Sequence, residues 1–227
     1  MTKIKSFGCS FFYGNDLHDD LRDEHWSKPS NYTWPALIAK QLSWAYECYA
    51  KPGSGNLQIL EKILTHAAID NSDTVYLINW TWSERFDYIQ TDLDPRWRDE
   101  WVTICPVSQS DVAAFYYRHL HSEPRDKLTS LIHIRTAIDI LQKRNIKFFM
   151  TFMDDTIFDR RWHAPLSITH LQDWVKPYLH TFDGDTFLEW SKCKNFKISE
   201  TLHPLEEAHA EAARYMLPAV NKLLYSA

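Results

Sequence analysis

The chain has 227 residues, of which 44% are hydrophobic and 24% charged, and its formal net charge is −5. This length and composition predict one globular domain and exclude disordered and fibrous proteins. The negative net charge and the absence of a long run of Lys or Arg argue against nucleic acid as a partner, because binding phosphates requires a concentrated basic face.

Targeting, redox and metal signals are weak throughout the sequence. No run of about 18 apolar residues predicts a membrane span, and the N-terminus does not resemble a secretion signal. The four cysteines are far apart and form no CxxC pair, which is typical of reduced thiols in the cytoplasm. No two histidines have the i, i+4 spacing of a helical zinc site. We therefore expect a cytoplasmic protein with no membrane partner, no metal and no cofactor.

Strand and helix patterns alternate along the first third of the chain. A strand at 3–7 runs directly into Gly8-Cys9-Ser10, whose small residues favour a tight turn. The following predicted elements are a helix at 34–42, a strand at 45–50, a helix at 57–67 and a buried strand at 74–79.

The rest of the chain contains two segments without a sustained period. They predict aromatic-rich loop insertions around 85–110 and 153–166 of a single domain that spans 1–227. Between and after them, the spacing of apolar residues predicts a helix at 128–141, a strand at 146–152 and a final helix that begins at Pro204. Alternating strands and helices indicate an α/β fold with a mostly parallel sheet that binds ligands beyond the carboxyl ends of its strands.

Residues suited to acyl transfer follow the predicted strands and precede the final helix. Ser10 stands at the end of the first strand and is a candidate nucleophile, and His203 is a candidate base, because histidine is the side chain best suited to accept a proton at neutral pH. Glu200, three residues earlier, is placed to orient the histidine. A glycine N–H at a tight turn, from Gly53 or Gly55, can stabilise the oxyanion.

Four segments of the chain resemble the sequence blocks of the SGNH, or GDSL-type, hydrolase superfamily. They are "IKSFGCSFFYGNDL", "YAKPGSGNLQI", "VYLINWTWSERFDY" and "ETLHPLEEAH". The resemblance implies a flavodoxin-like three-layer α/β/α sandwich and a serine esterase with a triad of Ser10, His203 and Glu200. It also makes Gly53 a better match than Gly55 to the oxyanion glycine.

The sequence departs from the pattern of this superfamily at two places. Glu200 stands where Asp is usual, and the third block has Asn79-Trp80-Thr81-Trp82 in place of Gly-x-Asn-Asp. Strict spacing favours Thr81 as the side-chain oxyanion donor, with Asn79 as the competing choice. For substrate binding the candidates are Gly55, Asn56, Trp80, Trp82 and Arg85, of which Arg85 could hold an anionic group.

Three functions are compatible with these residues. The first is an esterase or deacylase that acts on an acylated carbohydrate or small metabolite through an acyl-serine intermediate. The second is an acyltransferase with the same triad. The third is a binding module of the same fold that recognises a glycan or other ligand through Trp97 and Trp101; such a module does not need Ser10, His203 and Glu200 to form hydrogen bonds in series. The sequence does not indicate an oligomeric state.

Overall fold

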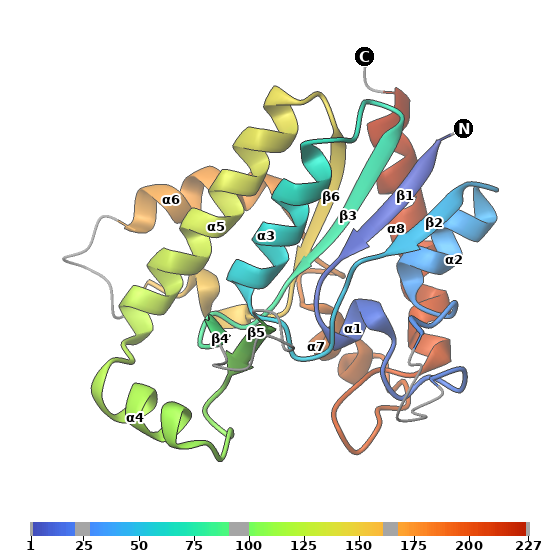
Figure 1. Ribbon diagram of the computed structural model, residues 1–227. Coiled ribbons are helices and arrows are strands. Elements are labelled where there is room, and N and C mark those ends of the chain that lie inside the picture. Colours follow the sequence, from blue (N-terminus) through green and yellow to red (C-terminus); the bar gives the residue numbers. More distant parts are fainter. Residues whose placement is uncertain (1, 21–27, 91–99, 161–167, 226–227) are drawn as a thin grey trace.

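The computed structural model describes residues 2–20, 28–90, 100–160 and 168–225, in which strands and helices alternate (Figure 1). In chain order the elements are β1 (Lys3–Phe7), α1 (Ser10–Tyr13), α2 (Trp34–Gln41), β2 (Ala45–Cys48), α3 (Asn56–Ala67), β3 (Thr74–Trp80), β4 (Phe86–Gln90), β5 (Glu100–Ile104), α4 (Asp111–His119), α5 (Glu123–Lys143), β6 (Lys147–Phe152), η1 (Asp155–Phe158), α6 (Ile168–Val175), η2 (Lys176–Tyr178), β7 (Leu179–His180), α7 (Phe187–Cys193) and α8 (Glu206–Tyr225).

The central sheet has the strand order β2-β1-β3-β6-β7, and every neighbouring pair is parallel. Helices α2 and α8 cover one face, and α3, α5 and α6 cover the other (Figure 1). This arrangement confirms the predicted three-layer α/β/α sandwich. The sequence pattern indicated only four of the five strands, because β7 has two residues and is too short to produce a period.

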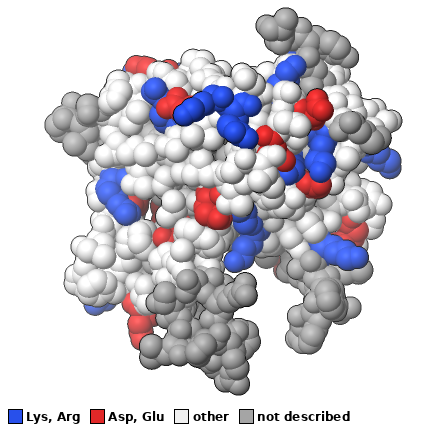
Figure 2. All heavy atoms as spheres, turned by 45° about the horizontal axis from the view of Figure 1, so that its top comes forward, with Lys and Arg blue, Asp and Glu red and all other residues white. Residues whose placement is uncertain are grey.

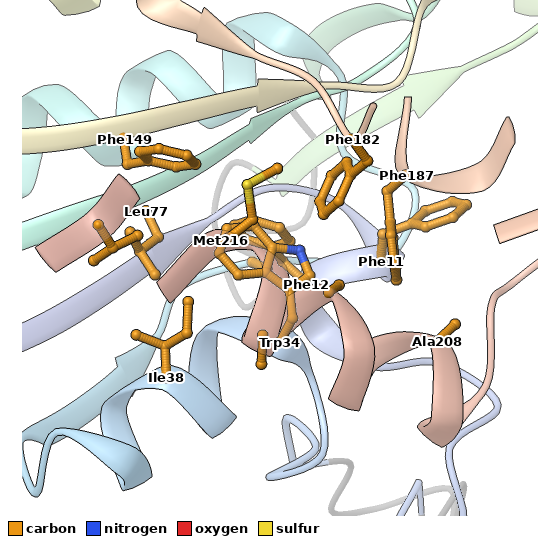
Figure 3. Packing of buried hydrophobic residues seen from close by; sticks show 14 of the residues in the cluster. Phe11, Phe12, Trp34, Ile38, Leu77, Phe149, Phe182, Phe187, Ala208 and Met216 are labelled. Carbon is orange, nitrogen blue, oxygen red and sulfur yellow. The ribbon is translucent and has the colours of Figure 1, made fainter. Parts of the chain in front are cut away.

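All seven residues of β3 are buried, as expected for a central strand of a covered parallel sheet. Its side chains divide between two apolar clusters, one on each face of the sheet. Figure 3 shows the cluster beneath α2 and α8, where Trp34 and Ile38 of α2 and Met216 of α8 lie against Leu77 and Phe149 of the sheet. These clusters fix the strands whose carboxyl ends carry the candidate site.

The segment around 85–110 was expected to be a loop, but the structure places an antiparallel hairpin of β4 and β5 there. Helix α4, which the sequence pattern did not predict, packs against this hairpin through Ala113 and Tyr116, which form a small buried cluster with Ile104. The hairpin and α4 lie to one side of the main layers (Figure 1). Within the second expected insertion, around 153–166, the structure describes η1, and residues 161–167 lie outside the described part.

Three further properties of the described structure are its surface charge, the state of its cysteines and the apolar character of its helices. Lys and Arg are interspersed with Asp and Glu on the face that Figure 2 shows, so the opposite charges screen each other there. All four cysteines are free thiols. Among the described helices, none combines the length and apolar character needed to cross a membrane.

Candidate active site

The turn after β1 presents Ser10 at the carboxyl edge of the sheet. Gly8 packs so closely on β3 that an added Cβ would lie 3.1 Å from the Asn79 carbonyl oxygen. This close approach favours glycine, and Ser10 begins α1 directly after the strand. As the first residue of a helix, Ser10 has a backbone N–H without a partner inside that helix.

His203 reaches Ser10 from a tight turn before α8. Its Nε2 lies 2.8 Å from Ser10 Oγ. The turn is held by the Ser199 N–H, which donates to the His203 carbonyl at 2.9 Å, and by the His203 N–H, which donates to Ser199 Oγ at 3.1 Å. Leu202 within it has a φ of 66°, a costly conformation for a branched residue. The structure therefore brings together the two residues that the sequence predicted as nucleophile and base.

The carboxylate beside His203 belongs to Asp16. Asp16 Oδ2 lies 2.8 Å from His203 Nδ1. The same oxygen accepts hydrogen bonds from Ser199 Oγ, at 2.7 Å, and from Thr201 Oγ1. Because an oxygen that receives several donors must act as an acceptor, His203 Nδ1 carries the proton and Nε2 is left to accept from Ser10. The side chains of Asp16 and His203 are 15% and 12% exposed, so water screens the pair only weakly.

Backbone geometry after α1 turns Asp16 back toward His203. Helix α1 ends at Gly14 in the left-handed conformation, with a φ of 89°. A Cβ there would lie 2.4 Å from the Ser30 Cβ, so the position requires glycine for two separate reasons. Asp16 also has a positive φ, of 69°, and its N–H donates to Asp20 Oδ2 at 2.9 Å. Aspartate tolerates this conformation better than most residues do.

Glu200, the acid expected from the sequence, does not contact His203. It is exposed on the turn and forms no hydrogen bond or ion pair with any residue that the structure describes. Its neighbours Ser199 and Thr201 direct their hydroxyls toward Asp16, and Glu200 lies between them. The structure thus assigns to Asp16 the position that sequence reasoning gave to Glu200. The signal that was missed is an acidic residue shortly after the helix-ending Gly14, on the same side of the sheet as Ser10.

The two side chains proposed as oxyanion donors, Asn79 and Thr81, differ in their hydrogen bonds and in their access to solvent. Asn79 lies against Gly8, and its Oδ1 accepts from the Thr151 hydroxyl at 3.3 Å. The Asn79 amide nitrogen makes no hydrogen bond to another described residue and can donate to a ligand. The Thr81 hydroxyl is sealed from solvent without a partner.

The polar groups of the turn from Gly53 to Asn56 are largely committed to structural bonds. The Lys51 N–H, just before it, donates to the Gly8 carbonyl at 3.1 Å. The Gly55 N–H donates to Asp87 at 3.0 Å and is not free for an oxyanion. The Asn56 side chain binds both backbone groups of Thr81, at 2.9 and 3.1 Å, and these two hydrogen bonds hold it in place. Gly53 is exposed with a φ of 77°, and no contact ties it to Ser10.

The predicted aromatic contacts divide into buried and site-facing residues. Trp80 is fully buried, and its Nε1 donates to Met150 Sδ at 3.4 Å, so the expectation of substrate binding is wrong for this residue. Trp82 is partly exposed, and its ring lies 5.9 Å from Phe11, which lies 5.0 Å from the His203 ring. Trp97 and Trp162 lie outside the described residues. Trp101 is partly buried on β5.

His209 is the second histidine near the site and is structural. It is fully buried on α8, and its Nδ1 accepts from the Trp34 N–H at the start of α2, at 3.1 Å. Burial, with a smaller contribution from His203, lowers the pKa of His209 to about 3. His209 is therefore neutral at physiological pH. No group of three His, Cys, Asp or Glu side chains in the described part of the chain is arranged to hold a metal ion.

Comparison with known proteins identifies the fold. No family model matches the sequence. No curated protein matches it significantly. Among solved structures, the chain is similar to a lipolytic protein of the G-D-S-L family from Veillonella parvula, with a TM-score of 0.52, 10% identity, and coverage of 98% of this chain and 100% of that one.

Two further structures show the same likeness. The esterase EstA from Pseudoalteromonas sp. aligns with a TM-score of 0.54 and 10% identity over 99% of both chains. A carbohydrate esterase family 2 enzyme from Corynascus thermopiles (Myceliophthora fergusii) aligns with a TM-score of 0.54 and 17% identity over 98% of this chain and 66% of that one. The sheet order, the position of Ser10 after β1 and these similarities together show that the chain has the SGNH hydrolase fold.

Proposed function

We propose that the protein is a serine esterase or deacylase in which Ser10 is the nucleophile, His203 the general base and Asp16 the residue that orients His203. The observation that carries this proposal is the series of two 2.8 Å contacts, from Ser10 Oγ to His203 Nε2 and from His203 Nδ1 to Asp16 Oδ2. A binding module has no need for this series.

The reaction follows from the direction of these hydrogen bonds. Ser10 Oγ attacks the ester carbonyl carbon while its proton passes to His203 Nε2. The tetrahedral intermediate then expels the alcohol, which takes the proton from His203, and an acyl-Ser10 ester remains. Water attacks this ester while His203 again accepts a proton; the second tetrahedral intermediate then releases the carboxylic acid as His203 returns the proton to Ser10 Oγ. Asp16 stabilises the imidazolium that forms in both steps.

The negative charge of the tetrahedral intermediate requires donors that are already in place. The Ser10 N–H at the start of α1 and the Asn79 amide at the end of β3 are the donors that we propose. Gly8 allows these two groups to lie close together because it has no side chain between β1 and β3. The substrate class that we propose is an acyl ester of a carbohydrate or small metabolite, in keeping with the carbohydrate esterases and esterases of similar fold.

The first test is covalent labelling together with turnover. Wild type, Ser10→Ala and His203→Ala are incubated with a fluorophosphonate probe and, separately, with 4-nitrophenyl acetate. Labelling at Ser10 by intact-mass and peptide mass spectrometry, with turnover lost in both variants, supports the proposal. Absence of labelling, with wild type no faster than the two variants, overturns it and favours the binding module.

A further inference from the structure

Arg85 differs from the other partly buried arginine of the described chain, Arg135, because it forms no ion pair. Arg135 pairs with Asp139, with Nε 2.9 Å from Oδ2. Arg85 forms no ion pair with any described residue; its Nη1 donates to the Ser54 carbonyl at 3.0 Å, and its guanidinium stacks 4.9 Å from the Trp82 ring centroid. The charge of Arg85 acts on the neighbouring Glu84 carboxylate, but the two groups form no ion pair, so the guanidinium can still form a paired contact with a ligand.

Two aromatic rings connect Arg85 to the candidate triad. The guanidinium lies over Trp82, whose ring packs edge-on against Phe11, and Phe11 contacts the His203 ring. From the other side, Ser54 holds the guanidinium through a turn that is bonded to Gly8 by the adjacent Lys51. Arg85 therefore lies at the same edge of the sheet as Ser10, and among the described residues only the Ser54 carbonyl accepts a hydrogen bond from it.

Arg85 also lines a small polar cavity of about 70 Å³, together with Asn56, Arg125, Ser130 and His133. This volume exceeds what one water requires. Burial and the charge of Arg125 lower the pKa of His133 to about 4, so this histidine is neutral at pH 7. The Arg85 side chain thus faces space into which a ligand group can enter.

The two carboxylates in the cavity wall are already bound by other groups. Asp87 accepts from the Gly55 and Gln58 N–H groups, each at 3.0 Å, and from the Thr103 hydroxyl at 2.5 Å. Asp126 pairs with Arg125 at 2.9 Å. Arg125 is thereby neutralised, and Arg85 is the unpaired positive charge among the residues that line this cavity.

From this arrangement we infer that Arg85 binds a carboxylate carried by the substrate, so that the ester cleaved at Ser10 is a monoanion. The inference rests on the proposed esterase function and specifies its substrate. A guanidinium binds a carboxylate through two parallel hydrogen bonds, and Trp82 holds its plane in a fixed orientation. A single unpaired cation matches the charge of a carboxylate better than that of a doubly charged phosphate monoester.

The experiment compares 3-acetoxybenzoate with its neutral methyl ester, which carries the same acetyl group on a similar phenol. The quantity measured is the ratio of kcat/KM for the carboxylate to kcat/KM for the methyl ester. In Arg85→Met this ratio is expected to fall roughly 10- to 100-fold, mainly through KM, because a charge-assisted contact is lost. Arg85→Lys, which keeps the charge, retains part of the ratio. Arg135→Met is the matched control, because Arg135 also stacks on a tryptophan, Trp174, and its ratio stays at the wild-type value.

Three results separate this inference from the proposed function. Equal losses for both esters in Arg85→Met, or a wild type that does not prefer the carboxylate, overturn the inference and leave the esterase proposal intact. If neither ester is hydrolysed, the result counts against the esterase proposal. The binding of a carboxylate ligand then decides the inference about Arg85. In that case, calorimetry on Ser10→Ala should show 3-hydroxybenzoate binding more tightly than 3-hydroxybenzamide, with the difference abolished by adding Arg85→Met. Equal binding of the two compounds refutes the role of Arg85.

Discussion

Replacing Asp16 by Asn should remove most of the esterase activity, whereas replacing Glu200 by Gln should leave it nearly unchanged. Asn keeps the size of the side chain and tolerates the positive φ of Asp16, so the turn after α1 should persist. The substitution removes the negative charge that faces His203 Nδ1 at 2.8 Å.

The size of this effect follows from the contact. Loss of a charge-assisted hydrogen bond of about 1.5–3 kcal/mol lowers the rate roughly 10- to 150-fold. If the new amide donates to His203 Nδ1, the ring holds its proton on Nε2 and cannot accept one from Ser10. A triad carboxylate replaced by an amide in this way costs about 10⁴ in kcat. We therefore expect Asp16→Asn to lower kcat by roughly 10² to 10⁴.

The assay is steady-state hydrolysis of 4-nitrophenyl acetate across the pH range, with thermal unfolding of each variant as the control for folding. A structural role alone would lower the Tm of Asp16→Asn without changing its pH–rate profile. Two results would refute the reasoning: a kcat for folded Asp16→Asn close to that of wild type, or a loss in Glu200→Gln as large as that in Asp16→Asn.

Three further predictions follow from the same geometry. Asn79→Ala should lower kcat roughly 10²- to 10³-fold, as expected for the loss of an oxyanion donor, and Thr81→Val should lower it much less. Steady-state kinetics of the two variants test this prediction. A larger loss in Thr81→Val than in Asn79→Ala would make Thr81 the donor. Gly14→Ala should lower the free energy of unfolding by about 1–3 kcal/mol, because of the positive φ and the contact at 2.4 Å; urea denaturation measures it, and an unchanged midpoint contradicts it. Because the pKa of His209 is about 3 when folded and 6.5 when unfolded, its contribution to stability is complete above pH 6.5 and declines as the pH falls toward 3. The loss of unfolding free energy at pH 5 is about 2 kcal/mol. Urea denaturation should therefore show a smaller difference in unfolding free energy between pH 7 and pH 5 in His209→Asn than in wild type. Equal differences in the two proteins would contradict the buried neutral state of His209.

Local sequence patterns account for the layout of the fold. Apolar residues recur with the period of a strand or a helix wherever an element has one face against the core, and this signal indicated β1, α3, β3 and α8 without any knowledge of their partners. Alternation of such elements is sufficient to predict a parallel sheet covered on both faces. Ser10 and His203 could be found in the same way, because each stands next to an element with a strong pattern.

The identity of the remaining site residues depended on contacts between distant segments. Asp16 and His203 are 187 residues apart, and only the positive φ of Asp16 and the turn around Leu202 bring them together. The choice of Asn79 over Thr81 likewise depends on which side chain Gly8 and Thr151 orient. Side-chain direction at the end of a strand is set by neighbouring strands and turns, whose contacts leave no periodic signal in the sequence. The sequence by itself therefore determined the fold class, the nucleophile and the base as predictions, and the tertiary structure decided that Asp16, and not Glu200, lies beside His203.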